Sequence, residues 1–420
     1  MTTQEYLTVK DALQMVLAGV SVLPAVEVEL PDALGYVLAK PVVAKDSLPP
    51  FANSAMDGYA VIAADLQDAS TEKPAVCRVV GDVAAGTAPT MTVTQGTAVR
   101  IMTGAPLPAG ADAVVPVEDT NEQWRRAERP LPETIAIYRS VKAGDYVRQI
   151  GEDIQAGQEV LPAGHVLRPQ EIGVLASLGV ARVAVIRRPK VGILATGDEL
   201  ISVDEPLRPG KIRNSNGYTQ AAQVKQMGAE PVVLGVARDD EADVRAKLQV
   251  GLDAGVDLFI SSAGVSVGAY DVVKAVLEAE GQVGFWRVRM RPGKPLAFGK
   301  YRGVPYLGLP GNPVSSTVSF ERFARAAILK MAGHTQFDRP QIPVVVEHDI
   351  DSDGRESYIR AIVKREGAGY TAVTTGSQGS HVMTSLVKAN ALLIIPEGVT
   401  HVKAGETLTA WMFDWPEHVF

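Results

Sequence analysis

The spacing of apolar residues is most regular between Ala181 and about Ala332. Short apolar runs predict strands there at 191–195, 231–236, 257–262 and 306–309. Helical spacing predicts helices at 217–227, 241–252 and 312–330. Strands that alternate with helices indicate a mainly parallel, doubly wound sheet with helices on both faces. In such a sheet, ligands bind at the carboxyl ends of the strands.

The stretch from Asp257 to Leu277 shows the change from strand to helix most clearly. An apolar run ending at Ile260 gives way to Ser and Gly as far as Gly268, and helical spacing follows from Val272. A loop of this kind at a helix N-terminus exposes backbone N–H groups that suit a phosphate. The glycines are equally compatible with a tight turn alone, and the stretch is neither a Walker loop nor a GxGxxG fingerprint.

Other parts of the chain follow shorter patterns. The sequence predicts an amphipathic helix from Thr8 to about Val20 and a short second helix around Ala33 to Leu38. Alternating residues from Lys73 to Val147 predict a small all-β module, and those from Pro340 to Phe420 predict a small barrel or sandwich.

Composition limits the functional classes. A chain of 420 residues with 46% hydrophobic content should hold two to four domains. A net charge of -7 argues against general nucleic-acid binding, and no run of eighteen apolar residues or secretory signal is present. We therefore expect a soluble, cytoplasmic protein with no membrane partner. The single Cys77 cannot form an intramolecular disulfide, and the six scattered histidines show no zinc-ligand spacing.

Polar, glycine-marked clusters follow each of the four predicted strands. They are Thr196–Leu200, Arg238–Asp240, the Ser/Gly loop that ends near Asp271, and Pro310–Ser315. Turn chemistry explains any one of them, but four together indicate a site. The carboxylates among them would repel one another unless a cation lies between them, and these are Asp198, Glu199, Asp239, Asp240 and Asp271. Hard oxygen ligands beside a phosphate loop suggest Mg²⁺.

A basic segment follows. No acidic residue occurs from Gly281 to Phe320, which contains Arg287, Arg289, Arg291, Lys294, Lys300 and Arg302. The first arginines alternate with apolar residues and should share one strand face, and a stiff turn presents Lys294. The interpretations are an anion site or a solvated edge strand.

Polar loops in the first half add candidates. Asp57 lies in a polar loop between Met56 and Tyr59, and Thr103 lies at the tip of a predicted hairpin. The acidic pair Glu152 and Asp153 follows an arginine, although such pairs are usually solvated.

Many of these motifs, in this order, resemble the molybdopterin molybdenumtransferase (MoeA) family, which is related to the E domain of gephyrin. The motifs are NSAMDGYA, RIMTGAPLPAGADAVV, VRQIGEDI, ATGDEL, RNSN, SSAGVSVGAYD, RPGKPLAFG, GLPGNPVS and TTGSQGSH. The resemblance implies an Mg²⁺-dependent transferase of molybdenum cofactor synthesis that inserts molybdate into adenylylated molybdopterin and releases AMP. It also implies an elongated homodimer whose active site is shared between subunits, and transient contact with other enzymes of the pathway.

The resemblance further implies four parts. They are a linking and dimer segment (1–46 and 145–180), a β module (47–144), a molybdopterin-binding-like α/β domain (181–335) and a C-terminal β-barrel (338–420).

The same resemblance assigns roles to residues by motif. Functional polar positions of the first half are Asp57, Thr103 and Asp153. The acids that handle Mg²⁺ and the adenylate are Asp198, Glu199 and Asp239, with Asp198 and Asp239 as metal ligands. Contacts to the pterin or the phosphates are Asn214, Ser215, Asn216, Gly264, Ser266, Gly268 and Asp271. The residues similar to the molybdate site are Arg291, Lys294, Ser315, Arg360 and Ser380.

Two positions depart from the family pattern. Ala52 stands where Asp is common, and Arg291 stands where Lys is common; a guanidinium binds an oxyanion as a planar fork rather than as a point charge. Two other functions are weighed: a molybdopterin adenylyltransferase, and a non-catalytic scaffold of the gephyrin kind. The sequence does not separate molybdate from tungstate, since both are tetrahedral dianions.

Overall fold

The computed structural model describes residues 6–122, 130–262 and 272–415. The chain forms two compact units. Unit 1 comprises Met1–Val28, Ala33–Ala39 and Ala184–Phe420, and unit 2 comprises Glu29–Asp32 and Lys40–Val183. The four-part division expected from the sequence stays a prediction.

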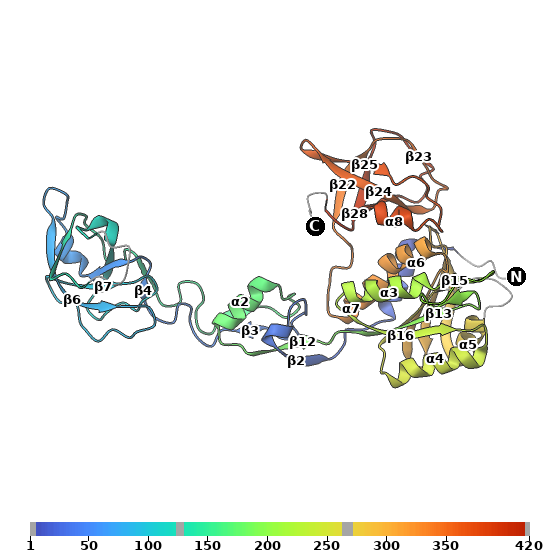
Figure 1. Ribbon diagram of the computed structural model, residues 1–420, viewed down its shortest axis with the longest axis horizontal. Coiled ribbons are helices and arrows are strands. Elements are labelled where there is room, and N and C mark those ends of the chain that lie inside the picture. The colour runs from blue at the N-terminus through green and yellow to red at the C-terminus, as the bar shows by residue number, and fades with distance from the viewer. Residues whose placement is uncertain (1–5, 123–129, 263–271, 416–420) are drawn as a thin grey trace. The chain divides into compact units, whose positions relative to one another are not determined.

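A seven-stranded sheet forms the centre of unit 1 (Figure 1). Its strands, in spatial order, are β1 (Tyr6–Leu7), β18 (Gly281–Val288), β20 (Pro295–Tyr301), β21 (Val304–Leu309), β17 (Leu258–Ser262), β13 (Lys190–Thr196) and β16 (Glu230–Ala237). The last four are parallel to one another, as predicted. Strands β18, β20 and β21 are antiparallel neighbours, and β1 runs parallel to β18. The basic strand β18 therefore has partners on both sides and is not an edge strand.

Helices cover both faces of this sheet, because its central strands are apolar in both directions. On one face lie α1 (Val9–Ala18), α3 (Ser215–Gln226), α6 (Pro313–Ser319) and α7 (Arg325–Met331). On the other face lie α4 (Glu241–Asp253) and α5 (Val272–Glu280). Adjacent strand residues alternate between the two cores: Ile193 joins the first and Leu194 the second. The doubly wound architecture is thereby confirmed.

Two local predictions need correction. The helix predicted at 312–330 is interrupted by a π-helical turn, η4 (Phe320–Ala324), which separates α6 from α7. The short helix predicted at Ala33–Leu38 is wrong: a 3₁₀ turn, η1 (Leu30–Asp32), precedes it, and Gly35 takes a φ of 77° that no right-handed helix accommodates.

The C-terminal part of unit 1 is a closed barrel, as predicted. Its strands are β24 (Glu356–Glu366), β25 (Gly369–Thr374), β22 (Gln341–Val346), β28 (Thr407–Met412) and β26 (Ala391–Ile395). The barrel closes because β24 pairs with both β25 and β26. Strand β19 (Met290–Arg291) adds to β24 in parallel. Shorter elements are β23 (Ile350–Asp351), α8 (Thr384–Lys388) and β27 (His401–Val402).

Unit 2 contains the predicted all-β module. Its five-stranded sheet has the order β8 (Ala113–Pro116), β5 (Gly58–Val61), β7 (Thr97–Ile101), β6 (Ala75–Val83) and β9 (Thr134–Ile137). Beside it are the strand pairs β10 (Val147–Arg148) with β4 (Asn53–Ser54) and β11 (Glu159–Leu161) with β3 (Val42–Val43), and the helix α2 (Pro169–Ser177). Cys77 is buried in this module, and burial raises the pKa of its thiol.

Short elements complete the described chain: β2 (Ala25–Glu29), η2 (Ala63–Leu66), η3 (Val117–Asp119), β12 (Arg182–Ile186), β14 (Leu200–Ile201) and β15 (Ile212–Arg213). Within the described ranges, every helix is too short or too polar to cross a membrane.

A buried carboxylate fixes the start of α2. Glu171 is 6% exposed, accepts a hydrogen bond from the Arg168 backbone at 2.9 Å, and lies 2.5 Å from the Arg168 guanidinium and 3.1 Å from His165. The Arg168 guanidinium holds the pKa of Glu171 well below its ordinary value of 4.5. The unfolded carboxyl therefore binds a proton at a higher pH than the folded one does.

We predict that Glu171→Gln lowers the urea midpoint of unfolding at pH 7, because the charged hydrogen bonds at the start of α2 are lost. The contribution of Glu171 is complete above pH 4.5 and is lost as the pH falls toward the lowered folded pKa. Urea unfolding measured across this pH range should show the two proteins converging at acid pH. The exposed Glu159→Gln is the control, and a difference that does not depend on pH would contradict the assignment.

Candidate functional site

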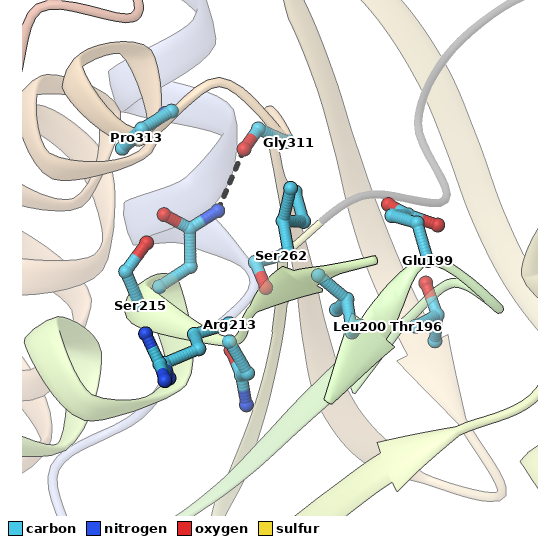
Figure 2. A pocket seen from close by; sticks show the side chains of 11 residues that line it. Thr196, Glu199, Leu200, Arg213, Ser215, Ser262, Gly311 and Pro313 are labelled. Carbon is cyan, nitrogen blue, oxygen red and sulfur yellow. Dashed lines mark hydrogen bonds between the residues drawn. The ribbon is translucent and has the colours of Figure 1, made fainter. Parts of the chain in front are cut away.

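A small pocket lies at the carboxyl ends of the parallel strands of unit 1. Thr196 ends β13, Ser262 ends β17 and Gly311 follows β21, and all three line this cavity of about 90 Å³. Figure 2 shows Ser215 on one side of Ser262 and Glu199 on the other, with Gly311 above Ser262 in this view. Loops that are far apart in the sequence therefore meet here because parallel strands end at one edge.

The first turn of α3 forms one wall of the pocket. Asn214 is the N-cap, is buried, and accepts a hydrogen bond from the Gly217 backbone at 3.0 Å. The Asn216 side chain donates to the Gly311 carbonyl at 2.7 Å, the dashed line in Figure 2. Asn214, Ser215 and Asn216 thus lie together, with Asn214 occupied as a cap and Ser215 directed into the pocket.

A larger cleft of about 930 Å³ shares Glu199 and Gly311 with this pocket. It joins the strand-end loops to the barrel, and its polar lining residues are Glu199, Arg291, Lys294, Asn312, Ser315, Arg355, Gln378, Ser380 and His381. Four of the five residues assigned to the molybdate site by resemblance therefore line one cleft. The turn that presents Lys294 needs glycine at Gly293, where φ is 112° and a Cβ would lie 2.5 Å from the Ser319 hydroxyl.

Few carboxylates oppose the positive charge of the cleft. The Lys294 ammonium lies 5.3 Å from the centre of the Tyr6 ring, and its hydrogen bond lowers the pKa of that phenol. Arg291 lies 4.0 Å from Asp353, but Asp353 is bound more closely by Arg355, at 2.5 Å. Arg355 thus neutralises much of the negative charge of Asp353. The positive charge of Arg291 therefore stays available to a ligand.

Arg360 adds a buried positive charge behind this cleft. It is 1% exposed and donates to the Ser385 hydroxyl at 3.1 Å and to the Gly379 carbonyl at 3.3 Å. Within the described residues it makes no ion pair. Burial, and then the nearby charge of Arg291, lower the pKa of Arg360 to about 10. A buried guanidinium bound only by neutral acceptors favours an anion in the adjoining cleft.

The basic face predicted for β18 and its continuation is only partly formed. Arg289 is paired with Glu397 at 2.6 Å, and Arg302 is paired with Glu280 at 2.7 Å. Both arginines are therefore structural, and Arg291 and Lys294 are the members of the segment that face the cleft.

Two of the predicted acids lie side by side. The Asp198 backbone donates to the Asp239 carboxylate, and the Asp239 backbone donates to the Asp198 carboxylate, both at 3.3 Å. Lys211 donates to the Asp198 carbonyl. Asp240, in contrast, is the N-cap of α4, and its carboxylate accepts a hydrogen bond from the Ala242 backbone at 3.1 Å.

The donor set of this pair suits Mg²⁺ only in part. Nowhere in residues 6–122, 130–262 and 272–415 do three His, Cys, Asp or Glu side chains gather in a metal-binding group. Two neighbouring carboxylates nevertheless fit an ion that takes its remaining ligands from water and substrate phosphates. The assigned residues Gly264, Ser266, Gly268 and Asp271 lie outside the described residues.

The candidates in unit 2 form a separate polar group. One oxygen of Asp57 accepts hydrogen bonds from the Thr103 backbone at 2.7 Å and from the Thr103 hydroxyl at 2.8 Å. Asp153 is exposed in the loop that follows β10. The structure therefore brings Asp57 and Thr103 together, and the role of all three toward the cleft stays a prediction.

Two residues of the cleft region were missed in the sequence. Tyr6 reaches Lys294 because β1 pairs with β18 across some 280 positions of sequence, and a two-residue strand gives no periodic signal. Arg355 lies in a turn rich in charged residues, which is indistinguishable in sequence from a solvated loop.

Comparisons with known proteins agree with this architecture. Three family models match: "MoeA N-terminal region (domain I and II)" at residues 7–179, "Probable molybdopterin binding domain" at 192–330 and "MoeA C-terminal region (domain IV)" at 343–413. The chain is 41% identical over 394 residues to molybdopterin molybdenumtransferase 2 of Mycobacterium tuberculosis, covering 92% of this chain and 94% of the relative. It is 39% identical to the molybdopterin molybdenumtransferase of Nostoc sp., covering 90% and 86%.

A solved structure gives the same result. The molybdopterin biosynthesis moeA protein from Pyrococcus horikoshii OT3 superposes with a TM-score of 0.81 at 29% identity, covering 97% of this chain and all of that one. The similarity therefore extends over both units and is not confined to the α/β domain.

We predict that molybdate stabilises the protein and that Arg360→Met removes most of this effect. At a concentration one hundred times its Kd, a bound ligand should add about 2.7 kcal/mol to the free energy of unfolding. Without molybdate the variant should be at least as stable as the parent, because it no longer buries a cation that lacks an ion-pair partner.

Thermal unfolding with and without molybdate tests this prediction. Lys364→Met, at the exposed end of the same strand, is the matched control and should keep the molybdate response. An Arg360→Met protein that molybdate stabilises as fully as the parent would show that Arg360 does not act on the anion.

Proposed function

Because this chain belongs to the MoeA family of molybdopterin molybdenumtransferases, we propose that it inserts molybdate into adenylylated molybdopterin with Mg²⁺-dependent release of AMP. The observation that carries the proposal is the cleft that holds Arg291, Lys294, Ser315 and Ser380 and continues past Glu199 into the pocket at the strand ends. Two adjoining cavities, which share Glu199 and Gly311, thus offer a cationic region for an oxyanion and a hydroxyl- and amide-lined region for phosphates.

The cationic end lowers the electrostatic cost of bringing two anions together. Molybdate is a dianion, and the dithiolene that receives it carries a phosphate. Arg291 and Lys294 face the cleft, and Arg360 adds its charge from behind. In a site partly screened from water, these charges offset repulsion more strongly than they would in bulk solvent. The hydroxyls of Ser315 and Ser380, which line this cleft, would donate to the oxyanion.

The proposed metal ligands, Asp198 and Asp239, line neither cavity, but Asp198 directly precedes Glu199, which lines both. Asp198 and Asp239 would hold Mg²⁺, which, when bound, polarises a phosphoryl oxygen of the anhydride. Their reciprocal backbone hydrogen bonds keep the two carboxylates together. Glu199 lines both cavities and would orient the water that replaces AMP on phosphorus. Asn214, Ser215 and Asn216, at the start of α3, supply donors for the phosphate oxygens.

The proposal extends to the assembly. We assign the exposed Asp57, Thr103 and Asp153 to the same active site, contributed by the partner subunit of a cytoplasmic homodimer. Support comes from the family resemblance and from the Asp57–Thr103 hydrogen bonds, which hold these two side chains in a fixed arrangement. Transient contact with the enzyme that supplies adenylylated molybdopterin is part of the same proposal.

We predict that Asp239→Asn abolishes Mg²⁺-dependent AMP release, because the amide keeps the shape of the side chain but removes a hard anionic ligand. AMP formed from adenylylated molybdopterin and molybdate, measured by chromatography with and without Mg²⁺, gives the result. Asp243→Asn is the matched control: this carboxylate also accepts from a backbone N–H of the same loop, at 2.8 Å from Arg238, but lies outside the pair.

An unchanged rate in Asp239→Asn would remove that residue from the metal site. The same assay separates the alternatives. Consumption of ATP, with pyrophosphate released, in place of the adenylylated pterin would indicate an adenylyltransferase, and turnover of neither substrate would leave the scaffold.

A further inference from the structure

We infer that Gln220 and Gln223 are positioning residues for the proposed reaction, acting through a line of side-chain amides that fixes α3 against α6. This line, the amide seam, consists of Asn216, Gln220 and Gln223 of α3 and their partners Gly311, Ser316 and Glu321. The inference rests on the proposed function, but Gln220 and Gln223 are not among the residues that line the pocket.

The middle contact of the seam is fully buried. Gln220 is 0% exposed and its amide nitrogen lies 3.0 Å from the hydroxyl of Ser316, which is 2% exposed. The amide oxygen of Gln220 is buried without a hydrogen-bond partner in the described part of the chain. Ser316 directly follows Ser315, which lines the cleft. Gln220 therefore holds the helix that carries a cleft residue.

The lower contact is anchored by charge. Gln223 donates to the Glu321 carboxylate at 3.0 Å, and Arg339 binds that carboxylate at 2.8 Å. Glu321 is 3% exposed and belongs to the π-helical turn η4. A π turn changes the rotation of the side chains that follow it, and here the turn coincides with the point at which Glu321 meets α3.

The upper contact reaches the pocket itself, where Asn216 donates to the Gly311 carbonyl at 2.7 Å (Figure 2). Residues 216, 220 and 223 are spaced by four and three positions and so lie on one face of α3. Their partners, residues 311, 316 and 321, follow one another along the facing segment in the same order. The seam therefore sets the register between the two walls of the pocket, the start of α3 and the loop 310–315.

Energetics indicate that the seam serves position more than stability. It lies in an otherwise apolar core that includes Val224, Val314 and Val318. Two of its amide oxygens, those of Gln220 and Gln223, are buried without partners in the described residues, and an unsatisfied buried polar group is unfavourable. Apolar side chains of the same length would fill the space at no such penalty. Apolar contacts, however, do not select one axial register, whereas hydrogen bonds to single atoms do.

The test replaces the amide with a side chain of similar length. Gln220→Met should keep the thermal midpoint of unfolding at or above that of the parent and lower kcat/KM for AMP release by about tenfold, since small misplacements of a bound substrate reduce rates steeply. Lys225→Met, which places the same side chain at an exposed position of the same helix, is the matched control and should leave kcat/KM unchanged.

Two further measurements separate positioning from folding. Ser316→Ala removes the partner hydroxyl and should give the same loss as Gln220→Met, and the double variant should lose no more than either single variant. Amide hydrogen exchange does not require turnover. It should be faster at the backbone amides of residues 217 and 316 in each variant, because these two amides mark the start of α3 and of α6.

The possible outcomes are distinguishable. If the parent releases AMP and Gln220→Met does so at the same kcat/KM with unchanged exchange, the seam has no positioning role. If Gln220→Met loses activity only in proportion to the protein that has unfolded, the amide is structural and the inference fails. If the parent itself releases no AMP, the proposed function fails, and the exchange measurement alone then decides whether the seam sets the register.

Discussion

The parallel hydrogen bonding of β13, β16, β17 and β21 is the constraint on which the rest of unit 1 depends. Parallel strands require a crossover after each strand, so every crossover loop begins at the same edge. Three polar segments that are separate in the sequence lie together at that edge: residues 196–200, 213–216 and 310–315. The site is therefore a product of topology first and of individual side chains second.

Opposite charges are separated at this edge of the sheet. Positive side chains gather where the turn 291–295 meets the barrel, whereas the carboxylates of Asp198 and Asp239 lie by the ends of β13 and β16. Within the cationic part, Asp353 is committed to Arg355, so its negative charge opposes Arg291 only weakly. The Asp198–Asp239 pair and the basic side chains of the cleft thus form two different electrostatic environments at this end of the sheet.

Sequence reasoning succeeded where periodicity was long and failed where geometry was local. The four parallel strands, α3 and α4 were predictable because burial on both sheet faces imposes continuous apolar runs and helices impose a 3.6-residue repeat. The false helix near Ala33 and the π turn at Phe320 depend on single φ values and on one extra residue in a turn, which leave no periodic trace.

The site shows the same limit. Residue types at strand ends predicted that Glu199, Lys294 and Ser315 belong to one region, and they line one cleft. The sequence did not reveal that Arg289 has an acidic partner in Glu397, nor that Arg360 is buried without one in the described part of the chain. The ion pair of Arg289 and Glu397 joins residues more than one hundred positions apart. The sequence shows which residues are charged but not which of them lie next to one another in the fold.

The placement of β1 has a consequence for how the protein is made. Tyr6 and Leu7 pair with β18, at residues 287–288, so the sheet of unit 1 combines the beginning of the chain with segments that leave the ribosome much later. Residues 40–183 are inserted between these segments and form a compact unit of their own. During synthesis, Tyr6 and Leu7 therefore remain without their β18 partners until residues 40–183 have emerged, and the sheet of unit 1 is completed only afterwards.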